Sequence, residues 1–280
     1  MRRGWKIFWI VCGAVVIVGL ACCAAAWGMG VTTDMLHGRF SNGIGWVRGE
    51  TRDSGKYLAE DIRQTYTDVR EIDVEIFAGE VNFFSSSDNE IVVETEGISE
   101  DLGFKCYMDG DELKLTTKKK LFHMNNVGVG SINVYIPRQM QFEEVSLDLA
   151  AGTLFVEEIC ANSLSVNVDA GEAIIDDFDA KEANLECGAG TITAGGVVAQ
   201  EIDMECGIGS ITYTAVGCEE DYNYDIECGV GEVICGDSSY SGLGADKTID
   251  NQAQKEINIE CGVGSVTIDF DKTSHHSEEH

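Results

Sequence analysis

The sequence has little positive charge and almost no proline. Its 280 residues include 19 Lys and Arg against 49 Asp and Glu, for a net charge of -30, and only 1 Pro. Such an acidic chain repels phosphate backbones, so nucleic acid is excluded as a partner. Hydrophobic residues make up 44% and charged residues 24%, close to the globular average, which argues against a wholly disordered or fibrous chain.

Catalytic side chains are scarce in the second half of the chain. Residues 143–272 contain no Arg and no His, which removes the usual general bases and oxyanion-stabilising groups other than carboxylates and Lys. Paired acids such as Asp176 and Asp177 would suit glycoside hydrolysis, but acids at turns are usually solvated surface. The sequence therefore predicts a protein that is not an enzyme and has no cofactor, with a carbohydrate-active enzyme as the less favoured alternative.

A long uncharged run covers residues 7–29, and Arg2, Arg3 and Lys6 precede it. As a helix at about 1.5 Å per residue it would reach roughly 34 Å, enough for a hydrocarbon core of about 30 Å. The basic flank favours a cytoplasmic N-terminus. We expect a single-pass signal-anchor in the cell membrane with an extracytoplasmic C-terminal domain. Cleavage of a signal peptide near Ala24–Ala26 is the alternative.

Glycines recur at a fixed interval. Gly152, Gly171, Gly190 and Gly209 are 19 residues apart, and each sits within a segment that alternates apolar and polar residues. When the unit is numbered so that this Gly is position eight, positions one, three, five, seven, ten and twelve are apolar or small. Alternation indicates two short half-buried strands, and the Gly marks the corner between them. The seven predicted turn glycines are Gly79, Gly152, Gly171, Gly190, Gly209, Gly231 and Gly264.

A unit of this length cannot bury its own apolar face, but stacked copies can. The predicted fold class is therefore all-β: a single-stranded parallel β-solenoid, or β-helix, with coils of about 19 residues, preceded by one N-terminal transmembrane helix. We expect inward ladders in chain order through Leu147, Val166, Leu185, Met204, Ile226 and Ile259, and through Leu154, Ala173, Ile192, Ile211, Val233 and Val266.

The composition shifts along the chain predict five regions. A basic start and anchor (1–30) precede a juxtamembrane linker (31–70), in which a short polar helix is expected over 56–67. An N-terminal strand unit with a hairpin at Asp109-Gly110 follows (71–142), then the solenoid repeats (143–271) and a disordered tail (272–280).

Four of the 11 cysteines share position five of the repeat, where earlier copies carry core hydrophobes. The sequence predicts a buried thiol ladder of Cys187, Cys206, Cys228 and Cys261, each acting as a small apolar residue. Parallel side chains on adjacent coils lie about 4.8 Å apart, wider than the roughly 3.8 Å between Cβ atoms in a relaxed disulfide. The four cysteines are supplied one per coil with parallel side chains, so they cannot converge tetrahedrally, and no metal site is expected at them.

Position four carries an outward carboxylate in nearly every copy. The simplest interpretation is a solvated face that keeps the solenoid soluble. A weak Ca²⁺ ladder is the functional alternative, because oxygen ligands suit Ca²⁺. Its candidates are Glu186, Glu205, Glu227 and Glu260.

Three stretches carry a family resemblance: IDVEIFAGEVNF from Ile72, DELKLTT from Asp111, and INVYIPRQMQFEEVSLDLAAGTLFVEEI from Ile132. Together with the serial Gly corners they resemble the bacterial β-strand-repeat family catalogued as a domain of unknown function and labelled "putative adhesin". The likeness covers roughly residues 70–270. It implies a β-helical, often membrane-anchored envelope protein without established catalytic residues.

These features predict a membrane-anchored, surface-exposed solenoid that acts as an adhesin-like binding or scaffolding module of the cell envelope. The expected partners are the membrane, through residues 7–29, and an envelope protein or polysaccharide. The alternative is a self-assembling structural scaffold whose uncapped terminal coils stack end to end.

Overall fold

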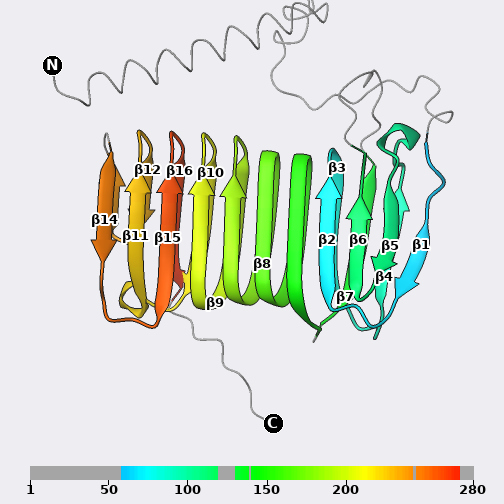
Figure 1. The fold of residues 1–280 in the computed structure, drawn as a ribbon, viewed down its shortest axis with the longest axis horizontal. Coiled ribbons are helices and arrows are strands. Elements are labelled where there is room, and N and C mark those ends of the chain that lie inside the picture. The colour runs from blue at the N-terminus through cyan, green and yellow to red at the C-terminus, as the bar shows by residue number, and fades with distance from the viewer. Residues whose placement is uncertain (1–57, 119–129, 139, 242–243, 272–280) are drawn as a thin grey trace, which may run out of the picture. The chain divides into compact units, whose positions relative to one another are not determined.

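The computed structural model describes residues 58–118, 130–138, 140–241 and 244–271, and these residues form an all-β structure (Figure 1). The strands are β1 (Arg63–Tyr66), β2 (Glu71–Ile76), β3 (Gly79–Ser86), β4 (Ile91–Glu96), β5 (Lys105–Asp109), β6 (Glu112–Thr116), β7 (Ser131–Pro137), β8 (Gln141–Cys187), β9 (Thr191–Cys206), β10 (Ser210–Val216), β11 (Tyr222–Cys228), β12 (Glu232–Cys235), β13 (Ser238–Ser241), β14 (Ala245–Ile249), β15 (Lys255–Cys261) and β16 (Ser265–Asp271). Two short 3-10 helices, Glu100–Leu102 and Glu219–Asp221, interrupt them.

The strands form two tracks joined at glycine corners. One track runs β5, β6, β2, β8, β9, β15, β11 and β14, and the other runs β1, β4, β7, β3, β8, β9, β10, β16, β12 and β13. The long strands β8 and β9 pass round the corners and so belong to both tracks. They pair in parallel at the 19-residue offset of the repeat, as Glu182 with Glu201 and Glu172 with Thr191 show.

The sheet is mixed, so the expectation of a parallel solenoid holds for the central coils and not for the whole repeat region. Antiparallel pairs join β1 to β4, β4 to β7, β5 to β6, β11 to β14 and β12 to β13. These pairs lie toward both ends of the stack, whereas the pairs between the central coils are parallel. A tight turn at Gly110 joins β5 to β6, and such a turn can join only antiparallel strands.

The first described residues join the sheet rather than forming the predicted polar helix over 56–67. Arg63–Tyr66 is the strand β1, paired antiparallel with β4. Backbone pairing with an edge strand outweighed the weak helical pattern of this segment. The predicted hairpin at Asp109-Gly110 is confirmed as β5 and β6.

The last two coils lie in the reverse of the expected order. The sequence predicts that Met204 is followed by Ile226 and then Ile259, but Met204 pairs with Ile259, and Ile259 pairs with Ile226. The chain therefore leaves a gap after β10, builds β11 to β14 one coil farther along, and returns to fill the gap with β15 and β16 (Figure 1). The two copies have nearly identical sequences, so the repeat pattern alone does not fix their order.

The core runs along the inside of the stack. Residues at positions three and ten of every repeat are at most 2% exposed, as the alternating pattern predicts. Burial at about 25 cal/mol per Å² of apolar surface is the main force that holds the coils together. Aromatic side chains add to it near the C-terminal coils, where the rings of Phe178 and Tyr213 stack with centroids 5.8 Å apart.

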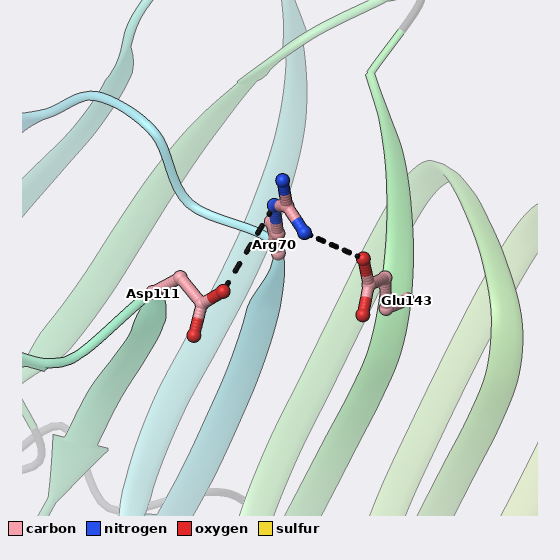
Figure 2. Close-up of polar contacts among 3 residues, drawn as sticks. All are labelled: Arg70, Asp111 and Glu143. Atoms are coloured by element: carbon pink, nitrogen blue, oxygen red, sulfur yellow. Dashed lines mark hydrogen bonds and ion pairs between the residues drawn. The ribbon is translucent and has the colours of Figure 1, made fainter.

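A rare basic residue ties three neighbouring strands together. Figure 2 shows Arg70, immediately before β2, between Asp111 of the β5–β6 turn and Glu143 of β8. Its Nη1 donates to Glu143 Oε1 at 3.1 Å, and its Nε lies 3.9 Å from Asp111 Oδ2. All three side chains are more than half exposed, so the pairs are screened by solvent.

We expect Arg70→Gln to lower the free energy of unfolding by about 0.5 to 1 kcal/mol at low salt, because two exposed ion pairs are lost. The loss should shrink toward zero in 1 M NaCl, where the screening length falls to about 3 Å. Urea unfolding at both salt concentrations measures it. Arg138→Gln is the control, since Arg138 is exposed and takes part in none of the ion pairs between described residues. Equal losses for both variants would contradict the assignment.

Among the described residues, no helix has the length and apolar character needed to cross a bilayer. The predicted span at 7–29 lies outside the described residues, as do the first part of the predicted linker and the tail over 272–280.

Candidate functional site

A groove of about 550 Å³ runs along one corner of the C-terminal coils. Residues of one short motif, Glu-Cys-Gly-x-Gly, line the groove at the ends of β8, β9, β15 and β11. Residues in and next to β14 line one end of it. Its lining consists of Glu186, Cys187, Gly188, Glu205, Cys206, Gly207, Glu227, Cys228, Gly229, Gly244, Asp246, Glu260, Cys261 and Gly262. We call it the corner groove.

The corner exists because the position-eight glycines stack directly on one another. A Cβ atom added to Gly171, Gly190 or Gly209 would overlap the carbonyl oxygen of the glycine in the preceding coil. Only Gly79 and Gly152 of the seven predicted turn glycines have a positive φ. At the other five, close approach of the coils, rather than a special backbone conformation, requires the glycine. The stack runs Gly130, Gly79, Gly152, Gly171, Gly190, Gly209, Gly264 and Gly231.

A row of carboxylates forms one wall of the corner groove. The strand register places Glu186 beside Glu205, Glu205 beside Glu260, and Glu260 beside Glu227. All four are exposed, and none is in an ion pair between described residues. Like charges about 4.8 Å apart in water repel by about 0.9 kcal/mol per neighbour before salt screening. We call these four residues the carboxylate row.

The carboxylate row does not converge on a point. Within the described parts of the chain, no three His, Cys, Asp or Glu side chains lie close enough to hold one metal ion. The carboxylates instead spread their charge along four coils, in the order Glu186, Glu205, Glu260, Glu227 rather than in chain order. This arrangement suits an extended cationic surface better than a single small ion.

Exposed aliphatic side chains follow the carboxylates by three residues in the last three repeats, outside the lining of the corner groove. Ile208 is 71% exposed, and Val230 and Val263 are each 53% exposed. Each is position seven of its repeat, next to the corner glycine, and neighbouring coils join here through backbone bonds from Val263 N to Gly207 O and from Val230 N to Gly262 O, both 2.8 Å. We call these three residues the aliphatic row.

Sequence reasoning counted position seven among the apolar positions and missed that it faces solvent. The glycine corner turns this residue outward, which breaks the inward-outward alternation of the strand. A signal was present: earlier copies carry Ala78, Ala151, Ala170 and Ala189 here, and only the last three copies carry large aliphatic residues. Large apolar residues at an exposed turn mark a contact surface more often than a core.

The predicted thiol ladder forms the floor of the corner groove. Cys187, Cys206, Cys228 and Cys261 are free thiols, each at most 3% exposed. The register makes them direct neighbours in the order Cys187, Cys206, Cys261, Cys228. Burial raises the pKa of Cys206, and it raises that of Cys261 to about 12, so both remain protonated at neutral pH.

Comparison with known proteins identifies a family with this sequence pattern. A family model described as Toastrack DUF4097 matches residues 69–278. None of the curated proteins matches the sequence. Among solved structures, a "putative cell adhesion protein" of Clostridium sporogenes is 14% identical with a TM-score of 0.42, covering 76% of this chain and 100% of that one. A "putative adhesin" of Bacteroides fragilis is also 14% identical, with a TM-score of 0.36 and coverage of 75% and 97%.

Proposed function

Because the chain belongs to the Toastrack DUF4097 family, we propose that it is an adhesin-like binding module of the cell envelope. In this proposal residues 7–29 anchor the chain in the membrane with the N-terminus in the cytoplasm. The described β-sheet domain is a rigid solenoid on the outer side, and it displays the corner groove to an envelope protein or polysaccharide. In this proposal the domain binds a partner and catalyses no reaction.

One observation carries the proposal: the aliphatic row follows the carboxylates by three residues, in the same Glu-Cys-Gly-x-Gly segments of the last three repeats. An exposed apolar stripe bordered by charge is typical of a surface that contacts a partner. The partner's chemistry follows from the groove, which presents four glutamates and Asp246 without Lys or Arg in its lining. A partner that combines positive charge with apolar groups fits both rows.

The structure disfavours end-to-end self-assembly. The sequence predicted uncapped terminal coils, but antiparallel strands close the described C-terminal end, where β14 lies on β11 and β13 on β12. These edge strands are only four or five residues long and carry charged residues such as Asp246 and Lys247. Short, charged, antiparallel edges discourage the in-register pairing that a growing stack needs.

Binding of a synthetic amphipathic Lys/Leu peptide to the purified full chain tests the proposal. The triple variant Ile208→Ser, Val230→Ser, Val263→Ser should weaken binding at least about tenfold, since each buried aliphatic side chain contributes more than about 1 kcal/mol. Its melting temperature should stay unchanged, because these side chains are already exposed.

Ile174→Ser is the matched control, since Ile174 is also an exposed aliphatic residue of a coil but lies at position eleven of its repeat, outside the aliphatic row. It should bind the peptide like the unsubstituted chain. The proposal fails if the triple variant and the control bind equally well, or if the unsubstituted chain does not bind the peptide at physiological ionic strength.

A further inference from the structure

The four cysteines beneath the corner groove form an uninterrupted row of thiols. Cys187, Cys206, Cys261 and Cys228 occupy the same position in four adjacent strands. The register places Cys261 directly between Cys206 and Cys228, one strand spacing from each. We call these four residues the thiol row.

The sulfurs point toward the glycine corner. A Cβ atom added to Gly209 would lie 2.7 Å from Cys187 Sγ, and one added to Gly264 would lie 2.6 Å from Cys206 Sγ. The position-eight glycines therefore cover the sulfurs, and the position-six glycines of the same segments line the corner groove together with all four cysteines. The carboxylate row above them attracts cations to this opening.

The spacing of the thiol row selects a coordination geometry. Adjacent strands are about 4.8 Å apart, and the described residues bring no three donors together, so tetrahedral and trigonal sites are excluded. Two metal–sulfur bonds of about 2.3 Å, the length known for zinc thiolates, span about 4.6 Å in a straight line. A linear sulfur–metal–sulfur unit therefore fits between neighbouring coils with little movement.

We propose that the thiol row binds a soft monovalent cation of the Cu(I) class, held linearly between two neighbouring cysteine sulfurs. Thiolates favour such soft cations over Ca²⁺ or Mg²⁺. In the binding step two S–H bonds break, two metal–sulfur bonds form, and both protons pass to water. The metal keeps its oxidation state, so no oxidant or reductant is consumed.

Binding should depend steeply on pH. The ordinary pKa of a cysteine thiol is about 8.5, so below that pH each cation must displace two thiol protons. The affinity for Cu(I) should then rise about 100-fold for each unit of pH between pH 6 and 8. Ordinary surface carboxylates, which are already ionised in this range, would give no such dependence.

The test compares two double variants of the full chain, in a background where Cys12, Cys22 and Cys23 are alanine. Cys206→Ala with Cys228→Ala leaves no two row thiols adjacent. Cys187→Ala with Cys235→Ala also removes two buried thiols but keeps Cys206, Cys261 and Cys228 together. Anaerobic competition with a chromophoric Cu(I) chelator measures affinity, and thermal unfolding checks that each variant folds.

We expect the first variant to lose at least about 100-fold in Cu(I) affinity relative to the second, because one of two sulfur ligands is missing. Equal affinities would overturn the proposal. X-ray absorption of Cu(I) bound to the background protein supplies a result that does not depend on the folding of the variants. Two sulfurs in linear coordination are expected; three or more sulfurs, or oxygen ligands, would contradict the proposed site.

Discussion

Replacing Gly190 by alanine is expected to lower the free energy of unfolding by about 3 kcal/mol or more, a large share of the 5 to 15 kcal/mol typical of a domain. The added methyl group would overlap the carbonyl oxygen of Gly171 and lie 2.8 Å from its nitrogen. Backbone atoms cannot rotate away as a side chain can, so the coils must separate. Separation weakens the backbone bonds of the corner, such as that from Ser210 N to Gly190 O.

Gly110→Ala is the control for this prediction. Gly110 has a φ of +72°, but a methyl group there meets no atom within 4 Å. Its replacement should cost only the left-handed backbone strain, about 1 to 2 kcal/mol. Urea unfolding followed by circular dichroism measures both variants. If Gly190→Ala costs no more than Gly110→Ala, the coils do not approach as closely as described.

The second large effect is expected at Tyr213, whose side chain is fully buried in the C-terminal half of the stack. Its ring stacks on Phe178, and its hydroxyl donates to the carbonyl oxygen of Gly196 at 3.1 Å. Tyr213→Ala should lower the free energy of unfolding by about 3 to 5 kcal/mol, because it leaves a cavity and an unpaired carbonyl.

Tyr213→Phe separates the two contributions. It keeps the ring and its contact with Phe178 and removes only the hydrogen bond, so the loss should be about 1 to 2 kcal/mol. Chemical denaturation with an unchanged m-value is the measurement. A Tyr213→Ala variant as stable as Tyr213→Phe would mean that the ring does not fill the core.

The coil pattern could be predicted from the sequence because burial imposes it locally. Alternating residues such as Leu185 and Met204 must face the core, and the glycine spacing fixes the coil length. The order of the last two coils could not be predicted in this way. Ile226 and Ile259 lie in nearly identical segments, so local sequence does not decide which of them pairs with Met204.

The short antiparallel strands and the aliphatic row were also beyond the sequence analysis. β13 and β14 are short and largely polar, so they carry no clear alternation, and their pairing depends on the strands they cover. The alternating pattern predicted that Ile208 faces the core, but the glycine corner places its side chain in solvent. For the candidate site, the repeat pattern predicted which glutamates and cysteines belong to the two rows. It did not predict which of them are direct neighbours.

The account depends on the coils stacking in the order in which the structure places them. Backbone nuclear Overhauser effects in the deuterated, isotope-labelled full chain test it most directly. We predict contacts between the strands of Met204 and Ile259, and between those of Ile259 and Ile226. Direct contacts between the strands of Met204 and Ile226, with Ile259 at the end of the stack, would contradict the account and would change the order of neighbours in the thiol and carboxylate rows.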